Sequence, residues 1–285
     1  TLDSGLPGGV TEADFLSRSK RSYKPLDQGK TVSESWFASL GGFAKDWNWV
    51  VDLNHRKKTV ESNYVADGFA TKNTTPSDRL GFRAWHKDRM GMFNTQAVVG
   101  LDAEAWKQTR IDDSRVEQNM QAIYGKYEMT HAATGLSGFI GARRTLADKK
   151  ASSGLDGGIT DRNTSADGGL SWALSPRSQL YIYRGNSFRL ANSDEYVCYP
   201  VYGTCASNPI NVIAPQRSQD TEVGYKFNTE QTQQTVRFYQ HKLTNEIGLD
   251  ENNWNNINYE PTLHKGVEWD QRLRFNSNWS LKTQL

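Results

Sequence analysis

Hydrophobic and polar residues alternate with a period of two along most of the chain, which is typical of β-strands that present two different faces. In residues 97–105 every odd position is Ala, Val or Leu, while Asp102 and Glu104 occupy even positions. In residues 47–53 the odd positions are Trp, Trp, Val and Leu. The one stretch that favours a helix is residues 11–19, with acidic residues in its first turn. The pattern therefore predicts an all-β fold.

The alternation predicts eleven or twelve strands, with connections of two kinds. The predicted strands are residues 31–43, 46–60, 77–88, 91–107, 115–130, 134–148, 165–175, 178–189, 217–228, 232–248, 257–275 and a last piece from 279. Six connections are short: residues 44–46, 87–91, 132–135, 175–177, 228–231 and 276–278. Five are long and rich in Gly, Asn, Ser, Asp and Thr: residues 61–76, 108–115, 149–164, 190–216 and 249–256.

Short and long connections alternate, so an antiparallel meander would place the tight turns at one end and the large loops at the other. This asymmetry is typical of outer-membrane barrels. A strand tilted by about 45° needs roughly 9–11 residues to cross a bilayer, and most of the predicted strands are at least that long. A soluble sandwich usually has strands nearer five or six residues. We therefore predict an antiparallel transmembrane β-barrel meander.

Composition excludes several other classes of protein. No window approaches about 18 consecutive apolar residues, which excludes a transmembrane helix but not a barrel. The 34 Lys and Arg residues nearly balance the 32 Asp and Glu residues without a basic cluster, so we expect no nucleic-acid partner. The five His residues are scattered, and no HExxH, GxSxG or Walker motif is present. We predict no enzyme activity, catalytic residue, metal site or cofactor.

The chain has two cysteines, Cys198 and Cys205, within the longest predicted loop. Pro and Gly lie between them, which suits a small closed loop, so we favour a disulfide. A disulfide would imply an oxidising compartment. The alternative is two unrelated free thiols.

Four stretches resemble segments of TonB-dependent outer-membrane receptors. They are residues 3–11 (DSGLPGGVT), 180–195 (LYIYRGNSFRLANSDE), 215–226 (PQRSQDTEVGYK) and 256–268 (NINYEPTLHKGVE). Their order and strand-sized spacings strengthen the resemblance, which covers most of the chain together with the meander. The family barrel has 22 strands. The resemblance thus implies that residues 1–285 form a partial barrel domain of about 11–12 strands, without the plug domain and the last strands.

The resemblance implies a bacterial outer-membrane receptor that takes up a scarce ligand with energy from TonB, most readily a ferric siderophore or similar metal chelate. Its partners would be that ligand, outer-membrane lipid and, through the plug, the TonB complex. Two alternatives remain open: a passive porin-type barrel, and a soluble all-β binding module. A half-barrel would also have two unpaired edges, so we do not expect the isolated chain to be stable.

Ligands of such receptors meet the loops at the extracellular end, because loops on a rigid scaffold carry binding residues. The candidate contacts in the loop 190–216 are Tyr196, Tyr199, Tyr202 and Asn208. Those in the loop 249–256 are Asp250, Asn252, Asn253 and Trp254. The alternative for each residue is a surface position without a role.

A separate polar set is predicted to face the lumen, where it would contact the plug. Charges on the lipid face would cost about 2–4 kcal/mol near the midplane, which favours the lumen. The set is Asp52, Asn54, Arg56, Arg83, Asp102, Glu104, Glu222, Lys226, Arg237, Glu268 and Asp270.

Overall fold

The elements that the computed structural model delimits within the described residues are β-strands. The structure describes residues 2–5, 16, 24, 26–65, 67–110, 115–152, 156–192, 195, 212–250 and 255–285. The strands are β1 (Leu2–Gly5), β2 (Gln28–Ala44), β3 (Trp47–Tyr64), β4 (Phe69–Met90), β5 (Phe93–Thr109), β6 (Arg115–His131), β7 (Leu136–Ser152), β8 (Asp156–Ser175), β9 (Ser178–Arg189), β10 (Gln216–Asn228), β11 (Thr232–Thr244), β12 (Glu246–Asp250), β13 (Asn255–Tyr259), β14 (Thr262–Arg274) and β15 (Ser280–Gln284). Over these residues, no helix is long and apolar enough to cross a membrane.

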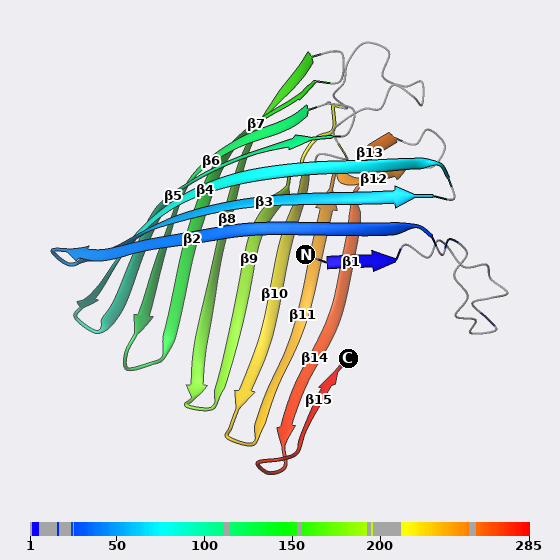
Figure 1. Ribbon diagram of the computed structural model, residues 1–285. Helices are drawn as coiled ribbons and strands as arrows, with labels where there is room; N and C mark the ends of the chain where they lie inside the picture. Colours follow the sequence, from blue (N-terminus) through cyan, green and yellow to red (C-terminus); the bar gives the residue numbers. More distant parts are fainter. Residues whose placement is uncertain are drawn as a thin grey trace.

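Thirteen of the strands form one antiparallel sheet in which each strand pairs with its neighbour along the chain. Its order is β1 to β11, then β14 and β15, while β12 and β13 form a separate hairpin. Figure 1 shows the sheet as a strongly curved, open trough with β1 near one edge and β15 at the other. The all-β meander predicted from the alternation is confirmed.

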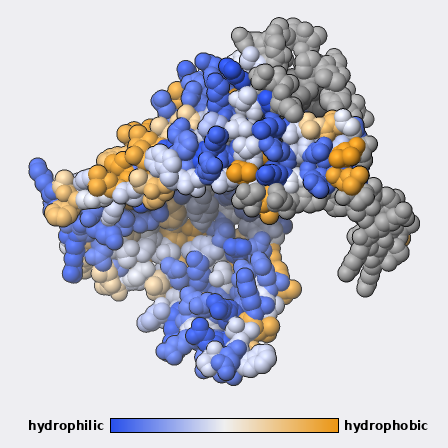
Figure 2. Space-filling model, viewed as in Figure 1, coloured by the Kyte–Doolittle hydropathy of each residue, from blue (hydrophilic) through white to orange (hydrophobic). Residues whose placement is uncertain are grey.

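The outer face of the sheet is hydrophobic. Register places the apolar positions of successive strands side by side, as in the row formed by Leu40, Val51 and Phe82. The exposed apolar side chains of this face are Leu40, Leu53, Leu80, Phe82, Val99, Leu101, Ile123, Ile140, Leu170, Trp172, Leu180, Ile182, Val223, Tyr225, Phe238 and Val267. Figure 2 shows hydrophobic side chains gathered toward the left of the view, bounded by hydrophilic ones.

The opposite, inner face is polar. Strand alternation and register place all eleven residues predicted to face the lumen on this one face. Tyr181 and Tyr183 also lie on this inner face, opposite Gly224 and Glu222 of β10. The hydroxyl group of Tyr181 donates a hydrogen bond to Glu222, which shows that the two side chains lie on the same face.

The predicted tight turns are confirmed at one end of the sheet. At the other end, two of the predicted long loops are wrong. Residues 61–76 and 149–164 instead extend the strands, leaving only 65–68 and 153–155 between them. Each of these polar stretches folds back on itself as the end of a hairpin, and in the first of them Glu61 and Lys72 form an ion pair at 2.8 Å. This hydrogen bond lowers the pKa of the Glu61 carboxyl group.

Pro76 lies within β4 rather than in a loop. It faces Lys57 of β3, but the ladder between β4 and β5 has no pair at residues 75 and 76. Proline has no backbone N–H to donate, which accounts for the interruption.

The predicted strands 232–248 and 257–275 each divide into two. β11 ends at Thr244, and Asn245 has a positive φ of 54°, which turns the chain into the β12–β13 hairpin. The predicted helix 11–19 lies outside the described residues except for Leu16.

Glycine and tyrosine pair repeatedly across the inner face. Gly100 lies opposite Tyr124, Gly224 opposite Tyr181 and Gly266 opposite Tyr239. In each pair the ring covers the glycine so closely that a Cβ atom there would overlap it. These glycines therefore provide the space in which the tyrosine rings lie flat against the neighbouring strand.

We predict that Gly100→Ala destabilises the full-length protein by about 1–3 kcal/mol, because its Cβ overlaps the Tyr124 ring. The urea midpoint of unfolding, followed by the mobility shift of the folded barrel on unheated gels, measures this. Gly125→Ala is the matched control, because a Cβ atom at residue 125 would come no closer than 3.6 Å to its nearest neighbour, the Val98 carbonyl oxygen. Combined with Tyr124→Ala, the cost of Gly100→Ala should shrink. Equal midpoints for the two glycine variants would contradict the account.

Candidate functional site

The inner face carries one connected group of charges around Asp102 of β5. Asp102 accepts a hydrogen bond from Arg143 of β7 at 2.6 Å and lies 3.7 Å from Arg79 of β4. The Arg143 guanidinium also lies over the Tyr124 ring, 5.4 Å from its centre. Asp102 is only 11% exposed, so this carboxylate is paired rather than solvated.

A cavity of about 450 Å³ opens beside this group. Asp52, Arg79, Arg83, Asp102 and Tyr124 line it. The wall of this cavity therefore carries both acidic and basic side chains.

A second group of charged side chains lies on the inner face of β9, β10, β11 and β14. Arg237 forms a hydrogen-bonded ion pair with Glu268 and lies 3.8 Å from Asp270. Lys226 lies 4.9 Å from the centre of the Tyr181 ring. A cavity of about 590 Å³ borders these residues. The inner wall thus offers donors and acceptors suited to hydrogen bonds with a polar protein surface.

His241 extends this second group toward the loop end. Its Nδ1 atom lies 2.7 Å from Oδ1 of Asp220, and its ring stacks on Tyr239 at 4.7 Å. His264 is its register partner on β14. Within the described part of the chain, no three His, Cys, Asp or Glu side chains form a group that could hold a metal ion.

At the loop end, the inner face is covered by a small hydrophobic core. Ala191 and Ile213, at the two ends of the loop 190–216, pack with Val116, Ala151 and Ile247. Ile247 belongs to the β12–β13 hairpin. The loop ends and the hairpin therefore lie over the inner face instead of projecting away from it.

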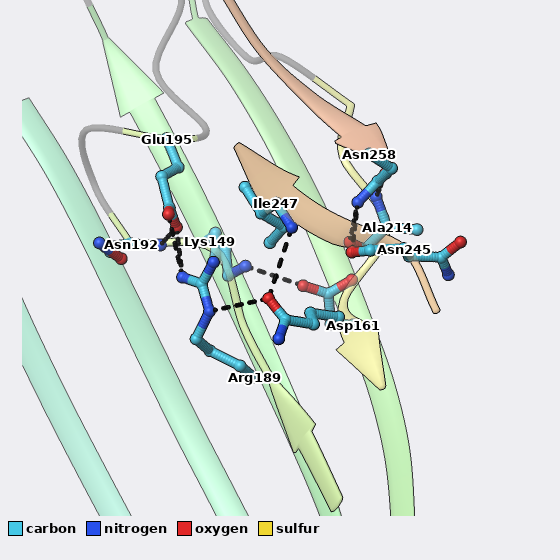
Figure 3. Close-up of polar contacts among 10 residues, drawn as sticks. Lys149, Asp161, Arg189, Asn192, Glu195, Ala214, Asn245, Ile247 and Asn258 are labelled. Atoms are coloured by element: carbon cyan, nitrogen blue, oxygen red, sulfur yellow. Dashed lines mark hydrogen bonds and ion pairs between the residues drawn. The ribbon is translucent and has the colours of Figure 1, made fainter. Parts of the chain in front are cut away.

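Polar contacts fix the ends of this loop (Figure 3). Arg189 donates from one nitrogen to both carboxylate oxygens of Glu195, at 3.0 and 2.7 Å. Glu195 also accepts a hydrogen bond from the backbone N–H of Asn192 at 2.8 Å. Because the ion pair spans the start of the loop, it holds the chain where it leaves β9.

Asn258 of β13 connects the hairpin to the other end of the loop. Its amide accepts from the backbone N–H of Ala214 at 2.7 Å and donates to the carbonyl groups of Ala214 and Asn245, both at 2.9 Å. Figure 3 shows this side chain between the two backbone segments. Two of these hydrogen bonds join the hairpin to the loop end at Ala214, and the third, to Asn245, closes the base of the hairpin.

Beneath these segments lies a buried ion pair. Lys149 of β7 and Asp161 of β8 are 2.9 Å apart and only 2% and 8% exposed. The pair is therefore shielded from water, and removing either partner would leave the other as an uncompensated buried charge.

Most of the ligand contacts predicted from the sequence lie outside the described residues. These are Tyr196, Tyr199, Tyr202, Asn208, Asn252, Asn253 and Trp254, together with Cys198 and Cys205. Asp250 is described and lies half-buried at the end of β12, in register with Asn255.

Several residues that organise the site are not among those predicted from the sequence. Arg143 shares the alternation of residues 137–145, which would have placed it on the inner face. The partnership of Asn258 with Ala214 joins positions 44 residues apart, and no local pattern signals it.

Comparison with known proteins gives one consistent family. The family model described as "TonB dependent receptor-like, beta-barrel" matches residues 3–285. No curated protein matches the chain.

Three solved structures share this fold. The ferric citrate transporter FecA has a TM-score of 0.74 at 14% identity, covering 95% of this chain and 43% of its own. The hemophore receptor HasR of Serratia marcescens, a double mutant solved with its hemophore HasA and heme, has a TM-score of 0.73 at 12% identity, with 87% and 47% covered. The siderophore receptor PiuA of Acinetobacter baumannii has 0.69 at 10% identity, with 91% and 46% covered. The chain spans about half the length of these structures.

We predict that Asn258→Ala releases the hairpin from the loop end, because it removes both hydrogen bonds to Ala214, of about 1 kcal/mol each, and a third to Asn245 at the hairpin base. In the full-length protein, hydrogen–deuterium exchange should accelerate in peptides covering residues 212–216 and 246–250 but not in β5 or β6. Asn63→Ala, an exposed asparagine at the same end of the sheet, is the control. Unchanged exchange in the Asn258 variant would show that the contacts do not hold the loop.

Proposed function

The chain belongs to the TonB-dependent receptor-like β-barrel family, and we propose that it is part of an outer-membrane receptor that imports a ferric siderophore or a similar metal chelate with energy delivered through TonB. The family is one of transport receptors rather than enzymes, and its barrels are outer-membrane proteins. The family match over residues 3–285 is the observation that carries the proposal.

The proposed chemistry of the ligand is taken from the structures that share the fold. One is a ferric citrate transporter and one a siderophore receptor. The hemophore receptor shows that a barrel of this shape also serves a protein partner and heme. A ferric chelate is therefore the first candidate for this chain, and heme is the second.

The organisation of the whole protein follows from the same argument. Since the chain spans about half of each relative, we propose that residues 1–285 are a partial barrel domain, completed in the whole protein by further strands and a plug. The charged groups around Asp102 and Arg237 would face the plug. Exposed Arg79 and the half-buried side chains around Arg237 suit an interface that opens and closes, since such an interface is polar.

Ligand capture is assigned to the loop end. Tyr196, Tyr199, Tyr202 and Asn208 belong to the loop whose two ends are fixed by Arg189–Glu195 and by Asn258. Asp250, Asn252, Asn253 and Trp254 belong to the adjoining hairpin. Because the bases of the loop and the hairpin are joined, we expect both sets of candidate contacts to lie at one end of the barrel.

We also propose that Cys198 and Cys205 form a disulfide within that loop. The chain would then close a small ring between Tyr196 and Asn208 and restrict the tyrosines that it carries. Thiol labelling of the denatured full-length protein should find no free cysteine before reduction and two afterwards. Labelling before reduction would overturn the pairing.

The two alternative functions differ in testable ways. A soluble module is disfavoured by the exposed apolar outer face. A passive porin-type barrel would transport without TonB.

The experiment is uptake of radioactive iron by cells that carry the full-length gene as their sole receptor of this type. The probes are ferric citrate, a ferric catecholate, a ferric hydroxamate and heme, each with and without TonB. We expect TonB-dependent uptake of one probe. Uptake independent of TonB would favour the porin, and uptake of none would overturn the proposal.

We predict that Tyr199→Ala weakens binding of the transported probe by roughly 30-fold, the usual effect of losing an aromatic anchor worth about 2 kcal/mol. Tyr225→Ala, an exposed tyrosine of the outer face, is the matched control and should bind normally. Equal affinities for the two variants would remove Tyr199 from the site.

A further inference from the structure

We propose that the inner face carries a metal site near its loop end, in which His241 and His264 bind one divalent transition-metal ion of the copper and zinc class. Asp220 acts beside them as a positioning residue. The proposal departs from the expectation, drawn from the scattered His residues of the sequence, that the chain has no metal site. It goes beyond the proposed function and does not depend on which ligand is imported or on TonB.

The first observation is a row of three side chains across three neighbouring strands, β10, β11 and β14 (Figure 1). Asp220 lies directly opposite His241, and His241 lies directly opposite His264. All three share the inner face with Arg237 and Glu268, because positions an even number of residues apart on a strand lie on one face. The Cβ atoms of directly opposite residues are about 4.5–5.5 Å apart. Two imidazole rings at this spacing can bind one ion, since metal–nitrogen bonds are about 2.0–2.1 Å long.

The second observation is the hydrogen bond that fixes the ring of His241. Its Nδ1 atom lies 2.7 Å from Oδ1 of Asp220. An ionised carboxylate only accepts hydrogen bonds, so Nδ1 carries the proton, and Nε2 of the neutral ring keeps a free electron pair for a metal ion. The hydroxyl group of Ser218 donates to the same carboxylate oxygen and holds it in place. Metal-binding histidines usually have this arrangement, with the second ring nitrogen bonded to a carboxylate or a carbonyl group.

Comparison with the other histidines shows what is particular to this pair. His55 makes the same contact with a carboxylate, since its Nδ1 atom lies 2.7 Å from Oδ1 of Asp78. Its register partner on β2, however, is Trp36, so no second imidazole lies opposite it. His86 likewise has an aromatic partner, Trp47. All five histidines of the chain lie in the described residues, and only those on β11 and β14 pair with each other.

The charges around the pair favour a bound cation. Thr262, two residues before His264 on the same face of β14, donates to Oε2 of Glu246 at 3.2 Å. This contact brings a second carboxylate to the part of the inner face that Asp220 already makes negative. The lysines next to the two histidines in sequence, Lys242 and Lys265, alternate to the outer face.

The site leaves coordination positions open. Within the described part of the chain, no three His, Cys, Asp or Glu side chains form a metal-binding group, so water or a small chelator would supply the remaining ligands. The side chain of His241 is 39% exposed, and His264 is exposed, so an ion can reach both. Imidazole suits zinc, nickel and copper, and copper binds most tightly of the divalent first-row ions. Magnesium prefers oxygen ligands.

The test is metal binding by the untagged full-length protein in detergent, with Cys198 and Cys205 replaced by serine so that thiols do not compete. The probes are Cu²⁺, Zn²⁺ and Mg²⁺ alone. We expect one bound Cu²⁺ whose electron paramagnetic resonance spectrum shows coupling to two imidazole nitrogens, and we expect excess Zn²⁺ but not Mg²⁺ to displace it. Absence of saturable copper binding, or a spectrum without coupling to two nitrogens, would overturn the proposal.

Three variants separate the ligands from the positioning residue. His241→Ala and His264→Ala should each lower the affinity for Cu²⁺ and remove the coupling to one nitrogen. Asp220→Asn should lower the affinity by roughly 10–100-fold, the usual effect of changing a group that orients a ligand, but should keep the coupling to both nitrogens. His55→Ala is the matched control, since it removes the same type of His–Asp contact elsewhere, and it should bind copper normally.

Folding and uptake are measured separately. Gel mobility of the unheated protein shows that each variant forms a barrel, so loss of copper binding by folded His264→Ala supports the site. Folded His241→Ala and His264→Ala variants that keep the full affinity for Cu²⁺ would show that the site is wrong, even where TonB-dependent uptake is normal. Failure to take up any of the iron probes would instead overturn the proposed function, and the copper spectrum would still decide whether the metal site exists.

Discussion

Every backbone N–H and C=O group that meets lipid must be hydrogen-bonded within the protein, and the remaining features of this structure depend on that constraint. A meander satisfies it strand by strand, since each strand pairs with its neighbours along the chain. Once the backbone is satisfied in this way, side chains alternate between two faces. Arg143 and Arg144 show the consequence. Arg143 lies on the inner face, where it forms an ion pair with Asp102, whereas the adjacent Arg144 lies on the outer face opposite Ile123.

The two faces are stabilised by different means. The outer face is mostly apolar, with exposed side chains such as Leu101, Ile123 and Leu170. The inner face pairs opposite charges across two or more strands, as Asp102 does with Arg143, and accommodates large rings over glycines. At the loop end the inner face is covered by a small hydrophobic core that includes Ala191, Ile213 and Ile247. This end of the inner face is therefore built from segments distant in the sequence.

The alternation of residues was sufficient to predict the strands, the tight turns and the assignment of Asp102 or Glu222 to the inner face, because a period of two is a local property. Residues 149–164 were misread as a loop because polar strands beyond the membrane lack an apolar face, and only pairing between β7 and β8 reveals them. The loop-end contacts of Asn258 were not predictable, since they join residues brought together by the tertiary fold. The role of Gly100 in making room for a tyrosine ring is predictable only once the strand register is known, because the register places it opposite Tyr124.

The most direct measurement of the two-faced sheet is spin-label accessibility along β5 of the full-length protein in native outer membranes, with the two cysteines replaced by serine. Single cysteines at residues 97–105 would carry the label. We expect oxygen accessibility to peak at Val99, Leu101 and Ala103, and accessibility to a water-soluble nickel complex to peak at Gly100, Asp102 and Glu104. A uniform profile, or the opposite phase, would contradict a sheet whose apolar face meets lipid.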